Sequence, residues 1–283
     1  MYQIQRVLNN NSILVNGDQE ENLIFMGKGI GFGKKVHDMI EYDASMDIYR
    51  FEKQNDKGDA MDIIESVEPM FIEASAAILQ EAVRVFGDVD TNILLPLADH
   101  IAFSIERMKQ DMIISNPFSN EIRLLYNEEY EVALKGKSII KQITGYEISD
   151  DEIGYITLHV HSALCHDKVP QSMQAAIIIK DSIEEVERDF HISIDMNSMS
   201  YVRLMNHMKF LLLRLRSDEE LQLDVSDFVK ERFTYAYTCA SRICKDLEKA
   251  FQKEIREVEV GYLALHIERI RTSEIEKQKA KQA

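Results

Sequence analysis

The sequence predicts a multidomain protein in which a small N-terminal antiparallel β-sheet domain is followed by two duplicated all-α helical bundle domains. Residues 1–58 alternate short runs of β-forming residues with turn signals. The rest of the chain has helical periodicity with little Gly or Pro. That helical part also repeats itself at an offset of 107 residues, which indicates two copies of one module.

Four strands are expected in the N-terminal part, namely residues 2–8, residues 12–16, Leu23–Met26 and Ile48–Phe51. Asn9-Asn10-Asn11 and Asn16-Gly17-Asp18 are turn signals between the first three. The polar segment Gln54–Asp59 is expected to be a linker. Because about 57 residues are few for a core of their own, this sheet should need a partner, most simply a second copy of itself.

The helical part begins at about Met61, and its periodicity is clearest in Met70–Val85 and Ile93–Met108. Pro170 is expected to close the first module, and Ile177–Phe190 to open the second. A length of 283 residues suits three domains. Their predicted bounds are 1–58, 65–170 and 171–283.

The duplication is most evident in the histidines. His100 and His159 are 59 positions apart, as are His207 and His266, and the copies are offset by 107. When the sequence is compared with itself at a fixed offset, a given histidine matches another histidine by chance about 3% of the time. Two such matches at one offset therefore indicate a duplicated site. Imidazole suits reversible proton, metal or phosphoryl chemistry near pH 7. The neighbouring matches are Phe103 with Phe210, Arg107 with Arg214, Glu152 with Glu259, Gly154-Tyr155 with Gly261-Tyr262, and Leu158 with Leu265.

Composition excludes several classes of protein. No run of about 18 apolar residues is present, and the N-terminus lacks an apolar signal-type core, so we expect a cytoplasmic protein without membrane insertion. The cysteines Cys165, Cys239 and Cys244 form no CxxC spacing. They are expected to be free thiols rather than disulfide or zinc ligands.

The net charge of −16 is unevenly distributed. Residues 1–58 carry 7 basic and 9 acidic residues, a net charge of −2, whereas the remainder carries 26 and 40, a net charge of −14. A polyanion would therefore bind at the N-terminal part, where Lys28, Lys34 and Lys35 lie among glycines.

The glycine-rich run Met26–Lys35 is neither a Walker A loop nor a GxGxxG motif. A nucleotide-phosphate site is therefore disfavoured. The run does offer a backbone that a ligand can approach closely, cationic side chains, and an aromatic ring, Phe32, able to stack on an unpaired base. The alternative interpretation is a tight hairpin with solvated lysines.

These residues carry a resemblance to the transcriptional antiterminators of the BglG/SacY family over essentially the whole chain. The matching motifs are Leu8–Asn11, Met26–Lys35, Asp99–Phe103, Gly154–His159, Asn206–Phe210 and Gly261–Arg269. The resemblance implies a dimeric co-antiterminator RNA-binding domain and two helical regulation domains that the sugar phosphotransferase system phosphorylates. Such a protein binds a leader mRNA hairpin and prevents terminator formation. The similarity to β-glucoside-responsive members is closest, so the resemblance implies a β-glucoside utilisation operon.

By this resemblance, the RNA contacts fall on Arg6, Asn11, Gly27, Lys28 and Phe32. An amide can read a base edge, a glycine lets RNA approach the main chain, cations meet phosphates, and an aromatic ring stacks. Family members often have Arg where Lys28 stands and Lys where Arg6 stands. Lysine lacks the planar fork that a bidentate contact at position 28 would need.

The resemblance places the phosphorylated histidines at His100, His159, His207 and His266. The implied partners are a sugar-specific enzyme II permease, inhibiting through the first module, and the phosphocarrier protein HPr, activating through the second. Asp99 could orient His100, and Asn206 stands at its place in the second module. The alternative is that the pairs are structural histidines on buried helix faces. The remaining histidines, His37, His161, His166 and His191, are expected to have no such role.

Two other classes of protein agree less well with the sequence. His166-Asp167 resembles the dyad of metal-dependent HD phosphohydrolases, but Ser273-Glu274 stands at its place in the second module. A DNA-binding regulator is disfavoured because the N-terminal part shows no helix-turn-helix. The sequence therefore predicts a non-enzymatic regulator without a metal or other cofactor.

Overall fold

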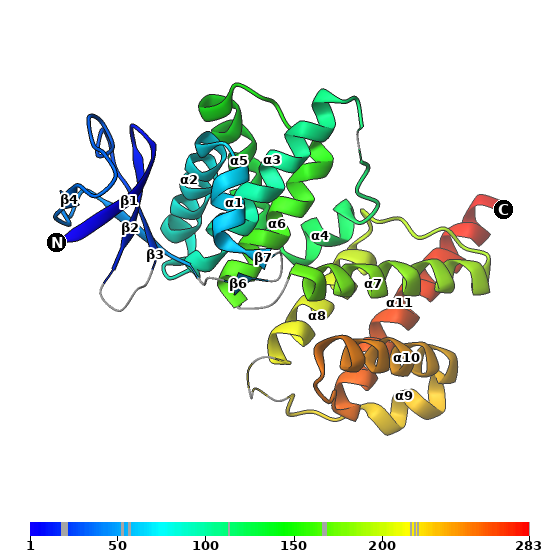
Figure 1. The fold of residues 1–283 in the computed structure, drawn as a ribbon. Helices are drawn as coiled ribbons and strands as arrows, with labels where there is room; N and C mark the ends of the chain where they lie inside the picture. The colour runs from blue at the N-terminus through cyan, green and yellow to red at the C-terminus, as the bar shows by residue number, and fades with distance from the viewer. Residues whose placement is uncertain are drawn as a thin grey trace. The chain divides into compact units, whose positions relative to one another are not determined.

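The computed structural model describes residues 1–17, 22–51, 54–55, 58–112, 114–165, 169–215, 217, 219 and 221–282. The chain divides into two compact units (Figure 1). Unit 1 comprises Met1–Asn116 with Glu128–Asp167, and unit 2 comprises Pro117–Asn127 with Lys168–Ala283. None of the helices in the described part of the chain is long and apolar enough to cross a membrane.

Unit 1 opens with a five-stranded antiparallel sheet in the order β4-β1-β2-β3-β5. Its strands are β1 (Tyr2–Asn9), β2 (Ser12–Asn16), β3 (Asn22–Met26), β4 (Met39–Ile40) and β5 (Asp47–Arg50). The four predicted strands are confirmed. The additional strand, β4, has two residues, which is too short for an alternating pattern to reveal it.

The turn between β1 and β2 is bound to the glycine-rich loop. Asn9 pairs with Ser12, which leaves Asn10 and Asn11 as a two-residue hairpin turn. The carbonyls of Asn10 and Asn11 accept hydrogen bonds from the amides of Gly31 and Gly27, at 3.0 and 2.9 Å. The loop and the hairpin turn are therefore joined by main-chain hydrogen bonds into one continuous surface.

Gly31 is required for this approach of two main chains. A Cβ atom at Gly31 would lie 2.2 Å from the carbonyl oxygen of Asn9. Backbone cannot yield to such a contact without moving the hairpin, so a side chain is excluded there. At Gly27, by contrast, the nearest atom is the flexible Ile30 side chain, at 3.0 Å.

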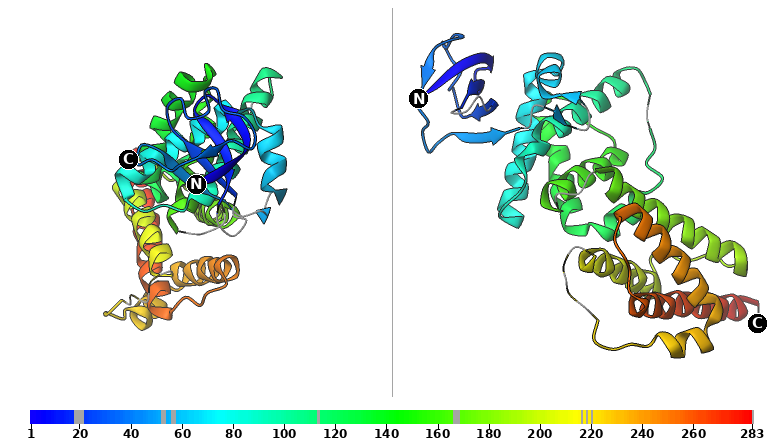
Figure 2. Two further views of the ribbon diagram at one scale, coloured as in Figure 1. Left: turned by 60° about the vertical axis from the view of Figure 1, so that its left-hand side comes forward. Right: turned by 60° about the horizontal axis from the view of Figure 1, so that its bottom comes forward.

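Both faces of the sheet are covered, and this explains why β2 and β3 are almost continuously buried. One face forms a small core of the domain, built on Ile4, Ile13, Val15, Leu23, Phe25 and Ile40. On the other face, Leu14, Ile24 and Tyr49 join the helical core of unit 1. The sheet lies next to α2 (Pro69–Phe86), as Figure 1 and the right view of Figure 2 show. A second copy of the sheet remains a prediction.

The segment predicted to be a linker contains a short hairpin instead. β6 (Gln54–Asn55) pairs with β7 (Gly58–Asp59), and α1 (Ala60–Ser66) follows at once. Asp56 and Lys57, at its turn, lie outside the described residues. Polar turn-forming residues are compatible with either structure, so composition alone did not distinguish them.

The helices of unit 1 that follow are α2, a 3₁₀ turn (Thr91–Ile93), α3 (Leu94–Lys109), α5 (Asn127–Thr144) and α6 (Asp150–Cys165). The predicted helices Met70–Val85 and Ile93–Met108 are thereby confirmed as α2 and α3. Pro69 stands in the first turn of α2, where its missing N–H costs nothing. Gly87 ends that helix at φ 88°, a conformation that favours glycine.

Unit 2 contains α4 (Ser119–Leu125), α7 (Val169–Phe190), α8 (Met199–Arg214), α9 (Ser226–Arg232), α10 (Thr234–Phe251) and α11 (Glu257–Gln282). Pro170, expected at the end of the first module, lies in the first turn of α7, the helix with which the chain enters unit 2 for the second time. A proline in a first helical turn starts a helix as readily as it ends one. The sequence counterpart of α9 is α4, which packs on α7 and α8. There Tyr201 Oη donates to Glu121 at 3.2 Å.

Replacing Gly31 by Ala should loosen the junction between hairpin and loop, because the new Cβ meets main-chain oxygen. We expect faster amide exchange across residues 27–33 and a loss of about 1–3 kcal/mol in local stability. Hydrogen exchange with mass spectrometry on the full chain measures this. Gly27→Ala, where only a side chain must shift, is the matched control and should change exchange much less. Equal protection in Gly31→Ala and the unmodified protein would contradict the assigned contact.

Candidate functional sites

The first histidine pair is assembled by two helices of unit 1. α3 contributes His100 and Arg107, and α6 contributes Glu152 and His159. In each helix the two residues are seven positions apart, which places them on one face two turns from each other. The imidazole centroids of His100 and His159 lie 5.1 Å apart. Sequence spacing therefore correctly identified a spatial pair.

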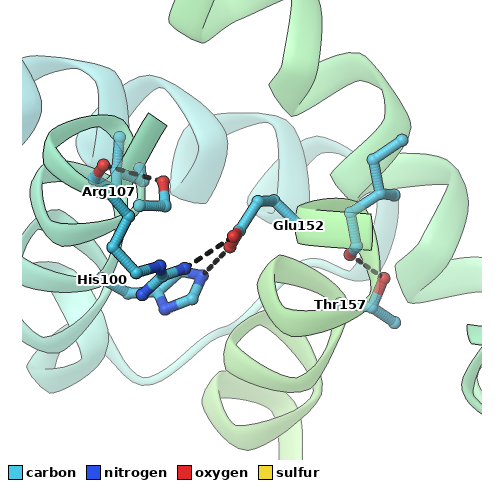
Figure 3. A network of polar contacts seen from close by, with 7 residues as sticks. His100, Arg107, Glu152 and Thr157 are labelled. Atoms are coloured by element: carbon cyan, nitrogen blue, oxygen red, sulfur yellow. Dashed lines mark hydrogen bonds and ion pairs between the residues drawn. The ribbon is translucent and has the colours of Figure 1, made fainter. Parts of the chain in front are cut away.

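A buried carboxylate, Glu152, lies between His100 and Arg107, as Figure 3 shows. Glu152 Oε1 accepts a hydrogen bond from Arg107 Nη2 at 2.6 Å. Its other oxygen, Oε2, lies 3.1 Å from His100 Nε2, at ion-pair distance. Burial alone would raise the pKa of Glu152, but the neighbouring His100 and Arg107 outweigh it and hold the pKa below its usual value. Glu152 is therefore an anion between two cationic or polar partners.

The second pair has the same components in unit 2. α8 carries His207 and Arg214, and α11 carries Glu259 and His266, again seven positions apart. The imidazole centroids lie 4.9 Å apart. Arg214 binds Glu259 with two hydrogen bonds, Nε to Oε1 at 2.5 Å and Nη2 to Oε2 at 2.8 Å.

The two sites differ in how the carboxylate is shared. Because Arg214 occupies both oxygens of Glu259, His207 Nε2 lies 3.8 Å from Oε2, farther than in the first module. Burial lowers the pKa of His207 to about 3, and nearby His266 and Arg214 contribute. Burial also lowers the pKa of His266, assisted by Arg269 and Arg203. The second pair is thus held in the neutral form that a nucleophilic imidazole requires.

Sequence reasoning did not assign Glu152, Arg107 and their counterparts to the sites, although each keeps the 107-residue offset. Asp99, which directly precedes His100, is the residue that the sequence suggests as its orienting group. The carboxylate that faces Nε2 of His100 is Glu152, from another helix. Adjacent helical residues point about 100° apart, so a neighbour in sequence is rarely a neighbour in the site.

The other described histidines lie outside the two duplicated pairs. His161 is buried on α6, with Nδ1 2.7 Å from Glu129 Oε1. Burial by itself would lower the pKa of His161. Its hydrogen bonds to Cys165 and Glu129 have the larger combined effect, so the pKa is raised. His37 and His191 are exposed, with φ of 73° and 52°. His166 and Asp167, the dyad of the metalloenzyme alternative, lie outside the described residues. Within the described part, no group of three or more His, Cys, Asp or Glu could hold a metal ion.

Three of the five residues expected to contact RNA lie together in the structure, and the other two lie outside that cluster. Asn11, Gly27 and Lys28 line one side of a groove of about 360 Å³, and Glu73, Ala76 and Gln80 of α2 line its other side. The amide of Gly29 donates to Asn11 Oδ1 at 3.0 Å, which fixes that side chain. Phe32, farther along the loop, is 76% exposed. Arg6 is exposed on β1, opposite Leu14, and is not part of the groove lining.

The domain order and the paired sites define a class of protein with one small β domain followed by two related regulatory helical modules. Residues 2–58 match the model of the CAT RNA binding domain, and residues 76–163 and 180–270 match the PRD domain. The chain belongs to the BglG family of transcriptional antiterminators. It is a non-enzymatic, RNA-binding antiterminator regulated through its two PRD domains, which implies control by the phosphotransferase system.

Relatives align over nearly their whole length. The GlcA/glcB genes antiterminator of Staphylococcus carnosus (strain TM300) is 31% identical over 273 residues, 94% of each chain. The Beta-glucoside operon antiterminator of Dickeya chrysanthemi is 28% identical over 285 residues, 98% of this chain and 99% of its own. The crystal structure of GlcT CAT-PRDI is 33% identical with a TM-score of 0.50, covering 58% of this chain and 98% of that one.

The His207 imidazole should stay neutral well below the pH at which exposed histidines titrate. Its folded pKa of about 3 lies below the ordinary 6.5, so the unfolded state takes up a proton first as pH falls. Stability should therefore decrease from about pH 6.5 towards pH 3. Histidine NMR titration and urea unfolding check both points. His207→Gln should reduce the pH dependence of the unfolding free energy. A His207 ring that titrates near pH 6.5 in the folded protein would contradict the assigned burial.

Proposed function

We propose that this chain binds a hairpin of a leader mRNA through the sheet side of the groove, formed by the hairpin turn and the glycine-rich loop, and so prevents an overlapping terminator from forming. The central RNA contacts are made by Asn11, Gly27, Lys28 and Phe32. Arg6, on β1 outside the groove, makes a further contact. The observation that carries this is the convergence of Asn11, Gly27 and Lys28 on one groove, beside an exposed aromatic ring.

The chemistry of these residues suits single-stranded or splayed RNA. The Asn11 amide can pair with a base edge, and Lys28 can meet a phosphate. Phe32, which is largely exposed, can stack on an unpaired base. The working form is a homodimer of the N-terminal domain, because a two-fold arrangement doubles the basic surface against the acidity of the helical part.

We further propose that His100, His159, His207 and His266 receive phosphoryl groups from the sugar phosphotransferase system. The neutral imidazole nitrogen attacks the phosphorus of a donor phosphohistidine or phosphocysteine. A P–N bond forms as the donor's bond to phosphorus breaks, and the donor side chain leaves. The sugar-specific enzyme II permease is the proposed donor for the first module, and the phosphocarrier HPr for the second.

The surroundings of the two pairs support opposite effects. In the first module a phosphate on the His100 ring would lie close to the Glu152 carboxylate, which faces Nε2 at 3.1 Å, and would repel it. The Glu152–Arg107 pair between α3 and α6 would then be disturbed. Phosphorylation there should therefore destabilise one arrangement of the module.

The second module offers cations for the phosphate. Arg203 is one helical turn before His207 on α8, and Arg269 is one turn after His266 on α11. Pro96 and Ser162 stand at their places in the first module. A phosphate there can bind guanidinium groups and fix the two helices together. We propose that this is why phosphorylation of the second module activates and that of the first inhibits.

RNA binding should depend on the groove. Asn11→Ala and Phe32→Ala should each weaken binding of a leader hairpin by about 1–3 kcal/mol, because each removes a base contact. A gel-shift titration with the full chain at two salt concentrations measures it. Lys34→Ala, which removes a loop cation but no base contact, should mainly reduce the salt dependence. Unchanged affinity in both the Asn11 and Phe32 variants would remove the proposed RNA surface.

The division of labour predicts different reporter phenotypes. His100→Ala or His159→Ala should give antitermination without an inducing β-glucoside, because the inhibitory charge can no longer be added. His207→Ala or His266→Ala should depress activity even with inducer. Arg203→Gln should do the same to a smaller extent, with Arg232→Gln, an exposed arginine on α9, as the control. Four histidine variants that behave alike would contradict the proposal while leaving RNA binding untouched. We propose a β-glucoside as the inducing sugar, as the resemblance implies. Induction by glucose and not by a β-glucoside would contradict that part of the proposal.

A further inference from the structure

A carboxylate from the first helical module occupies the RNA-binding groove. Glu73, on α2, accepts a hydrogen bond from Asn9 Nδ2 on Oε2 at 3.2 Å. Its other oxygen, Oε1, accepts one from Asn11 Nδ2 at 3.3 Å. Both oxygens of one carboxylate are thus bound by the hairpin that precedes the glycine-rich loop.

The oxygens of the two asparagines are already used inside the loop. Asn9 Oδ1 accepts from the Asn11 amide at 2.7 Å and from Ser12 Oγ at 2.9 Å. Asn11 Oδ1 accepts from the amide of Gly29. The side-chain NH₂ groups are therefore the donors that the loop presents outward. A base carbonyl or a phosphate oxygen would need these same donors.

The contact with Glu73 is part of a wider docking of the sheet on α2. Tyr49 Oη donates to the carbonyl of Ala76 at 3.5 Å, and Gln80 Nε2 donates to Asp47 Oδ2 at 2.5 Å. The apolar side of this interface is the face of the sheet that joins the helical core. Glu73 lies about one helical turn before Ala76, so docking of α2 brings the carboxylate to the hairpin by geometry alone.

The docked helix also makes the groove electrostatically unfavourable for RNA. Glu73 and Asp47 line it together with Lys28. Two carboxylates beside one ammonium leave a net negative site, which repels a phosphate backbone. Removal of α2 from the groove would leave Lys28 facing one carboxylate rather than two.

We propose that Glu73 competes with RNA for the side-chain NH₂ groups of Asn9 and Asn11, so that the sheet docked on α2 is the form that does not bind RNA. The proposal rests on the proposed RNA contact of Asn11. RNA binding requires the sheet to leave α2, or α2 to shift by enough to free both amides. Any event that weakens the docking, including a change in dimer packing after histidine phosphorylation, increases RNA affinity through this competition.

The test compares RNA affinity of full-length variants under one salt condition. Glu73→Gln removes the charge, and Glu73→Ala removes the acceptor as well. Glu131→Gln, an exposed carboxylate on α5, makes the same charge change away from the groove. We expect roughly 5- to 10-fold tighter hairpin binding for both Glu73 variants, the gain from removing one charge-assisted competitor, and no change for Glu131→Gln. Hydrogen exchange without RNA should also become faster at residues 9–12 in both Glu73 variants.

A double variant separates this proposal from the function on which it rests. Adding Glu73→Ala to Asn11→Ala should tighten binding by less than Glu73→Ala does in the unmodified chain, because only the Glu73 charge and its contact with Asn9 Nδ2 then remain to be removed. If Glu73 only supported the loop, its loss would weaken RNA binding, which would overturn the proposal. Unchanged affinity in the Glu73 variants, with Asn11→Ala still weakened, overturns the competition and leaves the RNA surface standing. Unchanged affinity in Asn11→Ala overturns both.

Discussion

A buried carboxylate–guanidinium pair holds together the two histidine-bearing helices of each module. Glu152 and Arg107 join α6 to α3, and Glu259 and Arg214 join α11 to α8. Breaking such a buried pair costs about 3–5 kcal/mol, because it leaves one charge unpaired in a low-dielectric interior. The paired imidazoles lie two turns along the same helix faces. Any charge added to them is therefore added directly to the contact that fixes helix packing.

This placement gives a physical basis for regulation by a small covalent change. A phosphate carries close to two negative charges, and the site already contains a buried anion. In the first module that anion lies next to His100, whereas in the second it is neutralised by two hydrogen bonds from Arg214. The proposed phosphorylation would therefore be opposed by a nearby carboxylate in the first module, whereas in the second module exposed arginines, Arg203 and Arg269, are within one helical turn of the histidines. The docking of the RNA-binding sheet on α2 lies in the same unit as the first site, so packing changes there can reach the groove through helices of one shared core.

The sequence predicted the parts of this architecture that periodicity and repetition control. The four longer strands, the helices α2 and α3, and the spatial pairing of the histidines follow from local patterns and from the 107-residue offset. The two-residue strand β4 and the hairpin at Gln54–Asp59 were missed because their signals are shorter than one period. Glu152 as the partner of His100, and Glu73 at the hairpin, depend on which helices pack together. The 107-residue offset marks Glu152 as a repeated residue but does not show what it contacts, and Glu73 has no repeated counterpart because Lys180 stands at its place.

The central claim is that the duplicated pairs, and no other histidines, are the sites of regulatory phosphorylation. Incubating the full chain with purified phosphotransferase components and phosphoenolpyruvate, followed by mass-spectrometric mapping under conditions that preserve phosphohistidine, tests it directly. The account predicts phosphate on at least one histidine of each pair, and none on His37, His161 or His191. Phosphate on His161, whose imidazole is buried against Glu129, or an absence of phosphate from both pairs, would contradict it.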